Sequence, residues 1–300
     1  MRTRLTILLI LLASLISGCS LKNLSVKATS ELLPPGLEVF ESEADIQLAH
    51  EAAAAQIKLM ETLHRSDPRR AEVLLALTRA LGSYAFAFLE WEAESNADVR
   101  KRAASLYNRG AGHGLELLDL KLGGGTALLA RSGSLEAFKS RLEGAKKEDV
   151  PALFWTAYDW AGAIRKSADS PRAVAELPRA VALAERALKL DPGYHYGAIH
   201  LFFGVYFAER PPLLGGDPKQ AEKHFSEAVS VGGGKYVMAK YLWAKTYAVR
   251  IQDAKLFEKL LKEVMNTPDD LLPEQRLAQE IAKDWARKLL KQKPNYFGES

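Results

Sequence analysis

The chain has 300 residues and only one cysteine, Cys19, so it cannot form an intramolecular disulfide. Packing alone must therefore hold the fold, even in an oxidising compartment. An excess of one charge is also missing, because 41 basic and 37 acidic residues leave a formal charge of +4. That is too little for the basic surface that binds nucleic acid. A mean hydropathy of −0.13 excludes a protein with many membrane spans, whereas a hydrophobic fraction of 48% is ample for a packed interior.

The sequence signatures of common metal and catalytic sites are missing as well. No His-x3-His pair with a neighbouring glutamate occurs among the six histidines His50, His64, His113, His195, His200 and His224. No Gly-x-Ser-x-Gly elbow is present, and neither glycine triplet continues into the Lys-Ser/Thr of a phosphate loop. We therefore expect a binding protein without catalytic residues, without a cofactor and without a metal site.

The N-terminus carries the most specific short motif. Basic residues up to Arg4 precede an apolar run from Leu5 to Ile16, which is shorter than the roughly twenty residues of a membrane-spanning helix. The small residues Ser17 and Gly18 then lead into Cys19, and this string looks like a lipobox. The prediction is a lipoprotein signal peptide over residues 1–18 and an acylated Cys19. The alternative is an ordinary signal peptide with an incidental cysteine.

The residues after Cys19 bear on where the protein is held. Several acyl chains on one cysteine make a lasting anchor, since each buried methylene contributes about 0.8 kcal/mol. Ser20 stands where, in enterobacterial sorting, an aspartate retains a lipoprotein at the inner membrane, so the outer membrane is favoured. Residues 19–41 contain Pro34-Pro35-Gly36 and show no sustained periodicity, which predicts a tether. A tether of about twenty extended residues reaches about 65 Å.

From Asp45 onward the apolar residues recur at three- and four-residue spacing, which predicts helices throughout residues 42–300. Ser170-Pro171 and Asp217-Pro218 are typical helix starts. No segment shows the period-two alternation of a strand, so the predicted fold class is all-α. The last predicted helix, over residues 273–291, has an apolar stripe that is typical of a helix closing a repeat array. That stripe consists of Leu277, Ile281, Trp285 and Leu289.

Helix pairs of this length suggest tetratricopeptide-like repeats, in which small residues let two helices approach closely. Second-helix spacing occurs in Ala180, Ala184, Ala187 and Pro192, and again in Ala221, Phe225 and Ala228. First-helix spacing occurs in His200, Phe203, Gly204 and Phe207, and a looser pair combines Thr78, Leu81 and Gly82 with Ala103, Tyr107 and Gly110. An insertion around Arg210–Gly216 interrupts the pattern. We therefore expect degenerate helical hairpins that form a compact solenoid.

Aromatic residues crowd two of the predicted helices, around Phe154–Trp160 and around Tyr194–Phe207. Core packing is the simpler explanation. The alternative is that some of these residues line an internal cleft that binds a small organic ligand. The residues expected in that cleft are Trp155, Tyr158, Arg165, His195, Tyr196, His200 and Arg210. The arginines could meet a carboxylate there, because the guanidinium fork matches two oxygens.

Several segments together resemble a known family. They are Ala76–Glu90, Ala152–Ala161, Ala175–Leu188, Leu190–Gly197, Phe203–Phe207 and the insertion with its flank, Arg210–Pro218. With the lipobox, they resemble the T-component lipoproteins (TatT) of TRAP transporters. That resemblance implies a tetratricopeptide-like periplasmic lipoprotein whose fold encloses a cleft or pore and whose partner is the transporter's substrate-binding subunit. It leaves the oligomeric state open, whether monomer or homo-oligomer.

A second hypothesis of a different class remains. Other tetratricopeptide lipoproteins act as general envelope-assembly adaptors that bind protein segments in an open groove. The two hypotheses differ in the shape of the binding surface, because an enclosed apolar channel suits a small ligand and an open groove suits an extended peptide.

Overall fold

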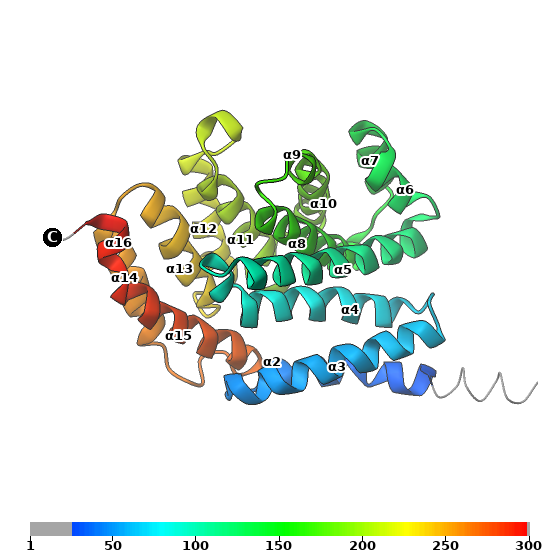
Figure 1. Cartoon of the computed structure of the whole chain (residues 1–300), viewed down its shortest axis with the longest axis horizontal. Helices are drawn as coiled ribbons and strands as arrows, with labels where there is room; N and C mark the ends of the chain where they lie inside the picture. The colour runs from blue at the N-terminus through cyan, green and yellow to red at the C-terminus, as the bar shows by residue number, and fades with distance from the viewer. Residues whose placement is uncertain (1–25, 299–300) are drawn as a thin grey trace, which may run out of the picture.

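The computed structural model describes residues 26–298, and over that range every regular element is a helix (Figure 1). The all-α fold class is therefore confirmed, whereas the assignment of the hairpins to the tetratricopeptide type stays a prediction. The signal peptide and Cys19 lie outside the described residues.

The elements follow one another with short connections. The α-helices are α2 (Leu33–Glu41), α3 (Ile46–Ser66), α4 (Ala71–Tyr84), α5 (Ala97–Leu122), α6 (Thr126–Ser132), α7 (Leu135–Leu142), α8 (Val150–Lys166), α9 (Pro171–Ala175), α10 (Leu177–Leu190), α11 (Tyr194–Glu209), α12 (Pro218–Val231), α13 (Met238–Leu242), α14 (Ala254–Met265), α15 (Arg276–Lys291) and α16 (Lys293–Phe297). Two π-helical turns continue α4 and α13, namely η1 (Ala85–Leu89) and η5 (Trp243–Ala248). The 3-10 turns are η2 (Glu92–Glu94), η3 (Lys147–Asp149), η4 (Pro212–Leu214) and η6 (Pro273–Gln275).

The predicted helix starts at Ser170 and Asp217 are confirmed. The Ser170 side chain accepts a hydrogen bond from the backbone N–H of Ala173, and Asp217 accepts from two N–H groups in the first turn of α12. A proline follows each cap, in the first turn, where no helical hydrogen bond is lost.

The tether prediction for residues 19–41 is wrong for residues 26–41, which are helical and packed against the domain. Val26 and Leu33 are buried in one cluster with residues of α3 and α4. The proline pair did not break the helix because Pro34 and Pro35 occupy the first turn of α2, where a missing N–H costs no hydrogen bond. The domain therefore begins earlier than residue 42.

The helices form a solenoid that closes on itself. Consecutive elements pack as neighbours, for example α4 with α5, α5 with α8, α8 with α10 and α11 with α12. Helix α15 comes back to the first helices of the described range and contacts both α2 and α3 (Figure 1). The predicted apolar stripe of this last helix is confirmed, since Leu277, Ile281, Trp285 and Leu289 are all buried.

Small residues lie at the helix crossings. Asp159 of α8 is fully buried between Gly82 of α4 and Gly110 of α5, where added Cβ atoms would lie 1.7 Å and 1.9 Å from its carboxylate oxygens. Gly204 of α11 lies in the same way against the ring of Phe225 in α12. Burial raises the pKa of Asp159 well above its usual value, which favours the neutral carboxylic acid.

The segment Ala71–Leu89, made of α4 and η1, is long and apolar enough to span a membrane. Its residues instead pack against α3, α5 and α8. The high hydropathy of this segment is explained by its place at the centre of the fold.

Candidate functional site

The closed solenoid surrounds a central cavity of about 590 Å³. Helices α2, α3, α4, α8, α11 and α15 all contribute to its wall, so residues as far apart in the sequence as Leu37 and Ile281 line one space. Most of the lining is apolar, and its aromatic members include Phe40, Phe86, Phe154, Trp155, Tyr158 and Phe202. A cavity of this size and character is typical of a site for a small organic molecule.

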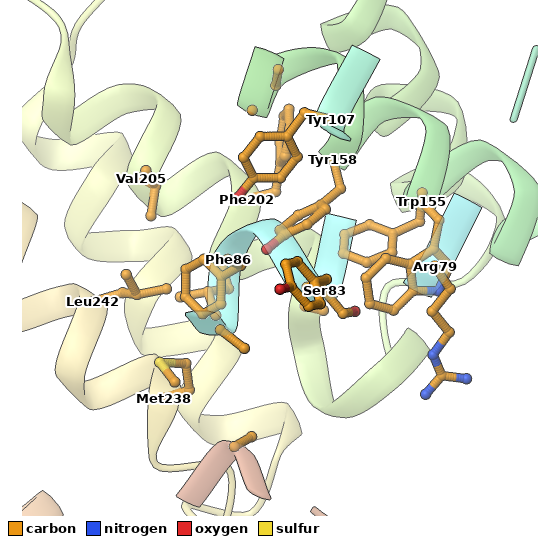
Figure 2. A pocket seen from close by; sticks show the side chains of 18 of the residues that line it. Arg79, Ser83, Phe86, Tyr107, Trp155, Tyr158, Phe202, Val205, Met238 and Leu242 are labelled. Atoms are coloured by element: carbon orange, nitrogen blue, oxygen red, sulfur yellow. The ribbon is translucent and has the colours of Figure 1, made fainter. Parts of the chain in front are cut away.

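The apolar part of the cavity is seen in Figure 2. Phe86 and Tyr158 lie in the middle, with Leu242 and Met238 on one side and Trp155 on the other. Burial, together with the nearby charge of Glu90, raises the pKa of the Tyr158 hydroxyl well above its usual value. Tyr158 therefore offers a neutral hydroxyl to an otherwise apolar space.

One wall of the cavity is a single stripe of α11. Its helical members recur at three- and four-residue spacing, which is the periodicity of one helix face: Ala198, Leu201, Phe202, Val205, Tyr206 and Glu209. His195 precedes them in a non-helical turn, and Arg210 follows them directly after the helix. From Ala198 to Arg210 this stripe is about 18 Å long at 1.5 Å per residue. The cavity is therefore elongated along α11.

One charged cluster links α2, α4 and η6 at the cavity. Arg79 of α4 pairs with Glu41 of α2, and its guanidinium lies 5.4 Å from the ring centroid of Trp155. The side-chain amide of Gln275 in η6 donates to the other oxygen of Glu41 at 2.8 Å. Each of these three side chains has a partner within the cluster, and their contacts hold α2, α4 and η6 together.

A second cluster holds a buried carboxylate. Glu90, only 2% exposed, pairs with Arg165, and Lys166 Nζ lies 2.7 Å from the same carboxylate oxygen. Burial alone would raise the pKa of Glu90, but the charges of Arg165 and Lys166 outweigh it and lower the pKa. Arg165 also reaches Glu209 at 3.4 Å.

Arg210 differs from the other two arginines of the lining. Its guanidinium stacks on the Tyr206 ring at 3.9 Å and donates to the Tyr206 carbonyl at 3.3 Å. Among residues 26–298 no carboxylate lies within 4.0 Å of it. The lining holds three arginines and two glutamates, so one positive charge is left without a partner. A ligand with one negative charge would balance it.

A left-handed turn opens α11. His195, Tyr196 and Gly197 have φ values of 45°, 56° and 81°, which are unusual for the first two residues because they carry a Cβ. The turn directs His195 to the cavity, where its ring lies edge-on to Trp155 with centroids 5.6 Å apart. Burial, with the charge of Arg79, lowers the pKa of His195 to about 3, so its imidazole is neutral. Strain of this kind is concentrated at binding sites.

The cavity brings together five of the seven residues expected in the cleft, namely Trp155, Tyr158, Arg165, His195 and Arg210. The cavity lining does not include Tyr196 or His200. The Tyr196 ring stacks on Tyr236 and its hydroxyl donates to Glu274 at 3.1 Å. His200 Nδ1 lies 3.1 Å from Nδ1 of His224 in α12. Tyr196 lies within the left-handed turn, and His200 lies on the face of α11 opposite to the one that Ala198, Leu201 and Phe202 turn to the cavity. Ligand binding by the other five stays a prediction.

Five charged residues of these clusters were not expected from the sequence: Glu41, Arg79, Glu90, Lys166 and Glu209. Arg79 and Glu90 had a usable signal, because they are the two charges within the otherwise uncharged run from Val73 to Trp91. Glu41 had none, since it lay in the segment that was expected to be a tether.

Comparison with known proteins agrees with this architecture. An uncharacterized protein of Treponema pallidum (strain Nichols) is 25% identical over 305 residues, which cover 94% of this chain and 94% of that protein. The family model described as TRAP transporter T-component matches residues 42–297, which include most of the cavity wall. The chain therefore belongs to the TRAP transporter T-component family, whose members are accessory components of these transporters.

Proposed function

We propose that this protein is a periplasmic lipoprotein, anchored through Cys19 and favouring the outer membrane, that binds an elongated apolar anion in its central cavity and docks the transporter's substrate-binding subunit. The single observation that carries the proposal is the apolar cavity with one unbalanced arginine. Its role is binding and not catalysis.

The ligand class follows from the shape and charge of the cavity. The stripe of α11 offers about 18 Å of apolar wall, which accommodates an extended alkyl chain. Arg210 lies at one end of that stripe and has no carboxylate partner among the described residues. A single carboxylate head group on an alkyl tail matches both features, because arginine binds carboxylates through two parallel hydrogen bonds.

The other hypothesis, an adaptor with an open peptide groove, has less support. Contacts of α15 with α2 and α3 close the solenoid around the cavity. A cavity of about 590 Å³ has the size of a small-molecule site, which favours a small ligand over an extended peptide.

Binding of dodecanoate, measured by calorimetry, tests the ligand proposal. Val205→Trp places an indole in the cavity and is expected to abolish binding, whereas Val39→Trp, at a position 73% exposed, should leave it unchanged. Arg210→Gln is expected to weaken dodecanoate binding at least tenfold, since a hydrogen bond to a charged group contributes about 1.5–3 kcal/mol. The uncharged dodecanol should bind wild type and Arg210→Gln alike. Equal dodecanoate affinity in wild type and Val205→Trp would refute the cavity as the site.

The rim of the cavity supplies a docking surface for the substrate-binding subunit. Leu214 and Val174 line the cavity and are 69% and 43% exposed, and Leu213 beside them is 98% exposed. Exposed apolar side chains that gather around a cavity are typical of a protein contact. We call Val174, Leu213 and Leu214 the apolar rim. A subunit seated there would face the same opening as Arg210.

Docking is tested by titrating the TRAP substrate-binding subunit against the full chain. Replacing both Leu213 and Leu214 by serine is expected to weaken binding at least tenfold, because exposed leucines become buried at the contact. Leu128→Ser, at a position 68% exposed on α6, is the matched control and should have no effect. Absence of any association between the wild-type proteins would contradict docking and leave the ligand proposal standing.

A further inference from the structure

Two histidines that are distant in the sequence meet outside the cavity. His64 lies in the last turn of α3, and His113 lies on α5, where Glu116 follows three residues later. Residues three apart share a helix face. His64 Nε2 is 3.6 Å from Glu116 Oε2, and His113 Nδ1 is 3.7 Å from the same oxygen. The two imidazole rings are nearly perpendicular, with centroids 4.9 Å apart.

These separations are too long for hydrogen bonds but close to those between the ligands of one metal ion. Hydrogen bonds of this type are 2.7–3.2 Å long. Around a tetrahedral Zn²⁺ with bonds of about 2.0–2.1 Å, neighbouring ligand atoms lie roughly 3.3 Å apart. The three ligand atoms of the cluster all lie within 4.8 Å of one another. A movement of a few tenths of an ångström would bring the Glu116 oxygen to this spacing from each imidazole nitrogen, and a rotation of the imidazole rings would have to bring their two nitrogens, which lie within 4.8 Å, to the same spacing.

The surroundings of the cluster also suit a cation. The side chains of His64 and His113 are 20% and 17% exposed, and Nδ1 of His113 is buried with no hydrogen-bond partner among residues 26–298. A buried nitrogen without a partner is unfavourable, and a bound ion would supply the partner. Glu116 is 50% exposed, so a further coordination position opens to water. Arg109, the nearest guanidinium on α5, is already paired with Glu61.

We propose that His64, His113 and Glu116 bind one divalent transition-metal ion, with water completing the coordination. Imidazole ligands favour zinc, copper or nickel over magnesium and calcium. Two histidines and one glutamate form a ligand set that zinc uses with one open position. No sequence motif predicts the site, because one histidine comes from a different helix. The ion would link α3 to α5, and α3 contributes Ala53, Gln56 and Ile57 to the cavity wall.

The test is calorimetric titration of Zn²⁺ into the full chain, purified in detergent without a histidine tag. We expect one equivalent of Zn²⁺ per chain. His113→Ala and Glu116→Gln should each weaken zinc binding at least tenfold. Zinc should also raise the Tm of the wild type but not of these variants, because a ligand stabilises only the state that binds it. Glu116→Gln changes a half-exposed side chain, so it tests the site even if His113→Ala perturbs the fold.

The pair His200 and His224 provides the discriminating control. Their Nδ1 atoms are 3.1 Å apart, so this pair is the other place where two imidazoles could hold an ion. His224→Ala is expected to leave zinc binding unchanged. Zinc binding that survives both His113→Ala and Glu116→Gln, or that disappears in His224→Ala, would overturn the proposal, and so would the absence of zinc binding to the wild type.

Discussion

Glu90→Ala is expected to lower the free energy of unfolding by about 3–5 kcal/mol, which is the usual cost of removing one partner from a buried ion pair. The Glu90 carboxylate is 2% exposed and is the shared partner of Arg165 and Lys166. Without it, Lys166, whose side chain is only 7% exposed, loses its carboxylate partner, and Arg165 keeps only Glu209 at 3.4 Å. Urea unfolding followed by circular dichroism measures the loss.

An exposed carboxylate serves as the control for Glu90, and the pH dependence of stability tests the ion pair itself. Glu227→Ala removes an exposed carboxylate from the middle of α12 and should change stability little. The pKa of Glu90 is lowered in the folded chain, so its contribution to stability is complete above the unfolded pKa. That contribution is lost as the pH falls through the folded value. Wild type and Glu90→Ala should therefore differ most near neutral pH and converge in acid, and a difference that stays constant with pH would contradict the ion-pair explanation.

Gly82→Ala is expected to lower the free energy of unfolding by about 2–3 kcal/mol, because overpacking a close helix crossing forces neighbouring atoms to move. The new methyl group would lie 1.7 Å from a carboxylate oxygen of Asp159, and Gly110 closes the other side of that carboxylate. Gly112→Ala, on α5, meets nothing within 4 Å. That control should be stabilised by up to about 1 kcal/mol, since alanine favours a helix over glycine.

A double variant shows whether the clash with Asp159 is the cause. Asp159→Ala removes the carboxylate, and the methyl group of Gly82→Ala then occupies the vacated space. The double variant Gly82→Ala/Asp159→Ala should therefore be more stable than the sum of the two single effects predicts, by about 1 kcal/mol or more. Strict additivity in urea unfolding would mean that the two side chains do not meet.

The sequence predicted the helices well because their signals are local. Apolar periodicity, the caps at Ser170 and Asp217 and the stripe of α15 are each contained within a few turns of chain. The helical start of the domain was not predicted, because a proline pair breaks a helix in its interior but fits its first turn. The sequence alone does not say which position Pro34 and Pro35 occupy, and the structure places them in the first turn of α2. The meeting of α15 with α2 and α3 depends on contacts across the whole chain and has no local signal.

The site was predictable only in part, for the same reason. Trp155 and Tyr158 were found because aromatic residues crowd their helix, and His195 because it lies in a second aromatic segment. Proximity in the sequence does not say which side of the chain a residue faces, so Tyr196 and His200 were grouped with residues that line the cavity. Positive φ values set the direction of His195 and Tyr196, and only the adjacent Gly197 hints at that turn in the sequence.

The most direct test of the cavity as the functional site is a crystal structure of the protein with 12-bromododecanoate, in which anomalous scattering locates the bromine. We expect the carboxylate on the Arg210 guanidinium and the alkyl chain along α11, with the bromine inside the cavity near Ala198. A bromine bound only on the outer surface, with the cavity left without the probe, would contradict the account.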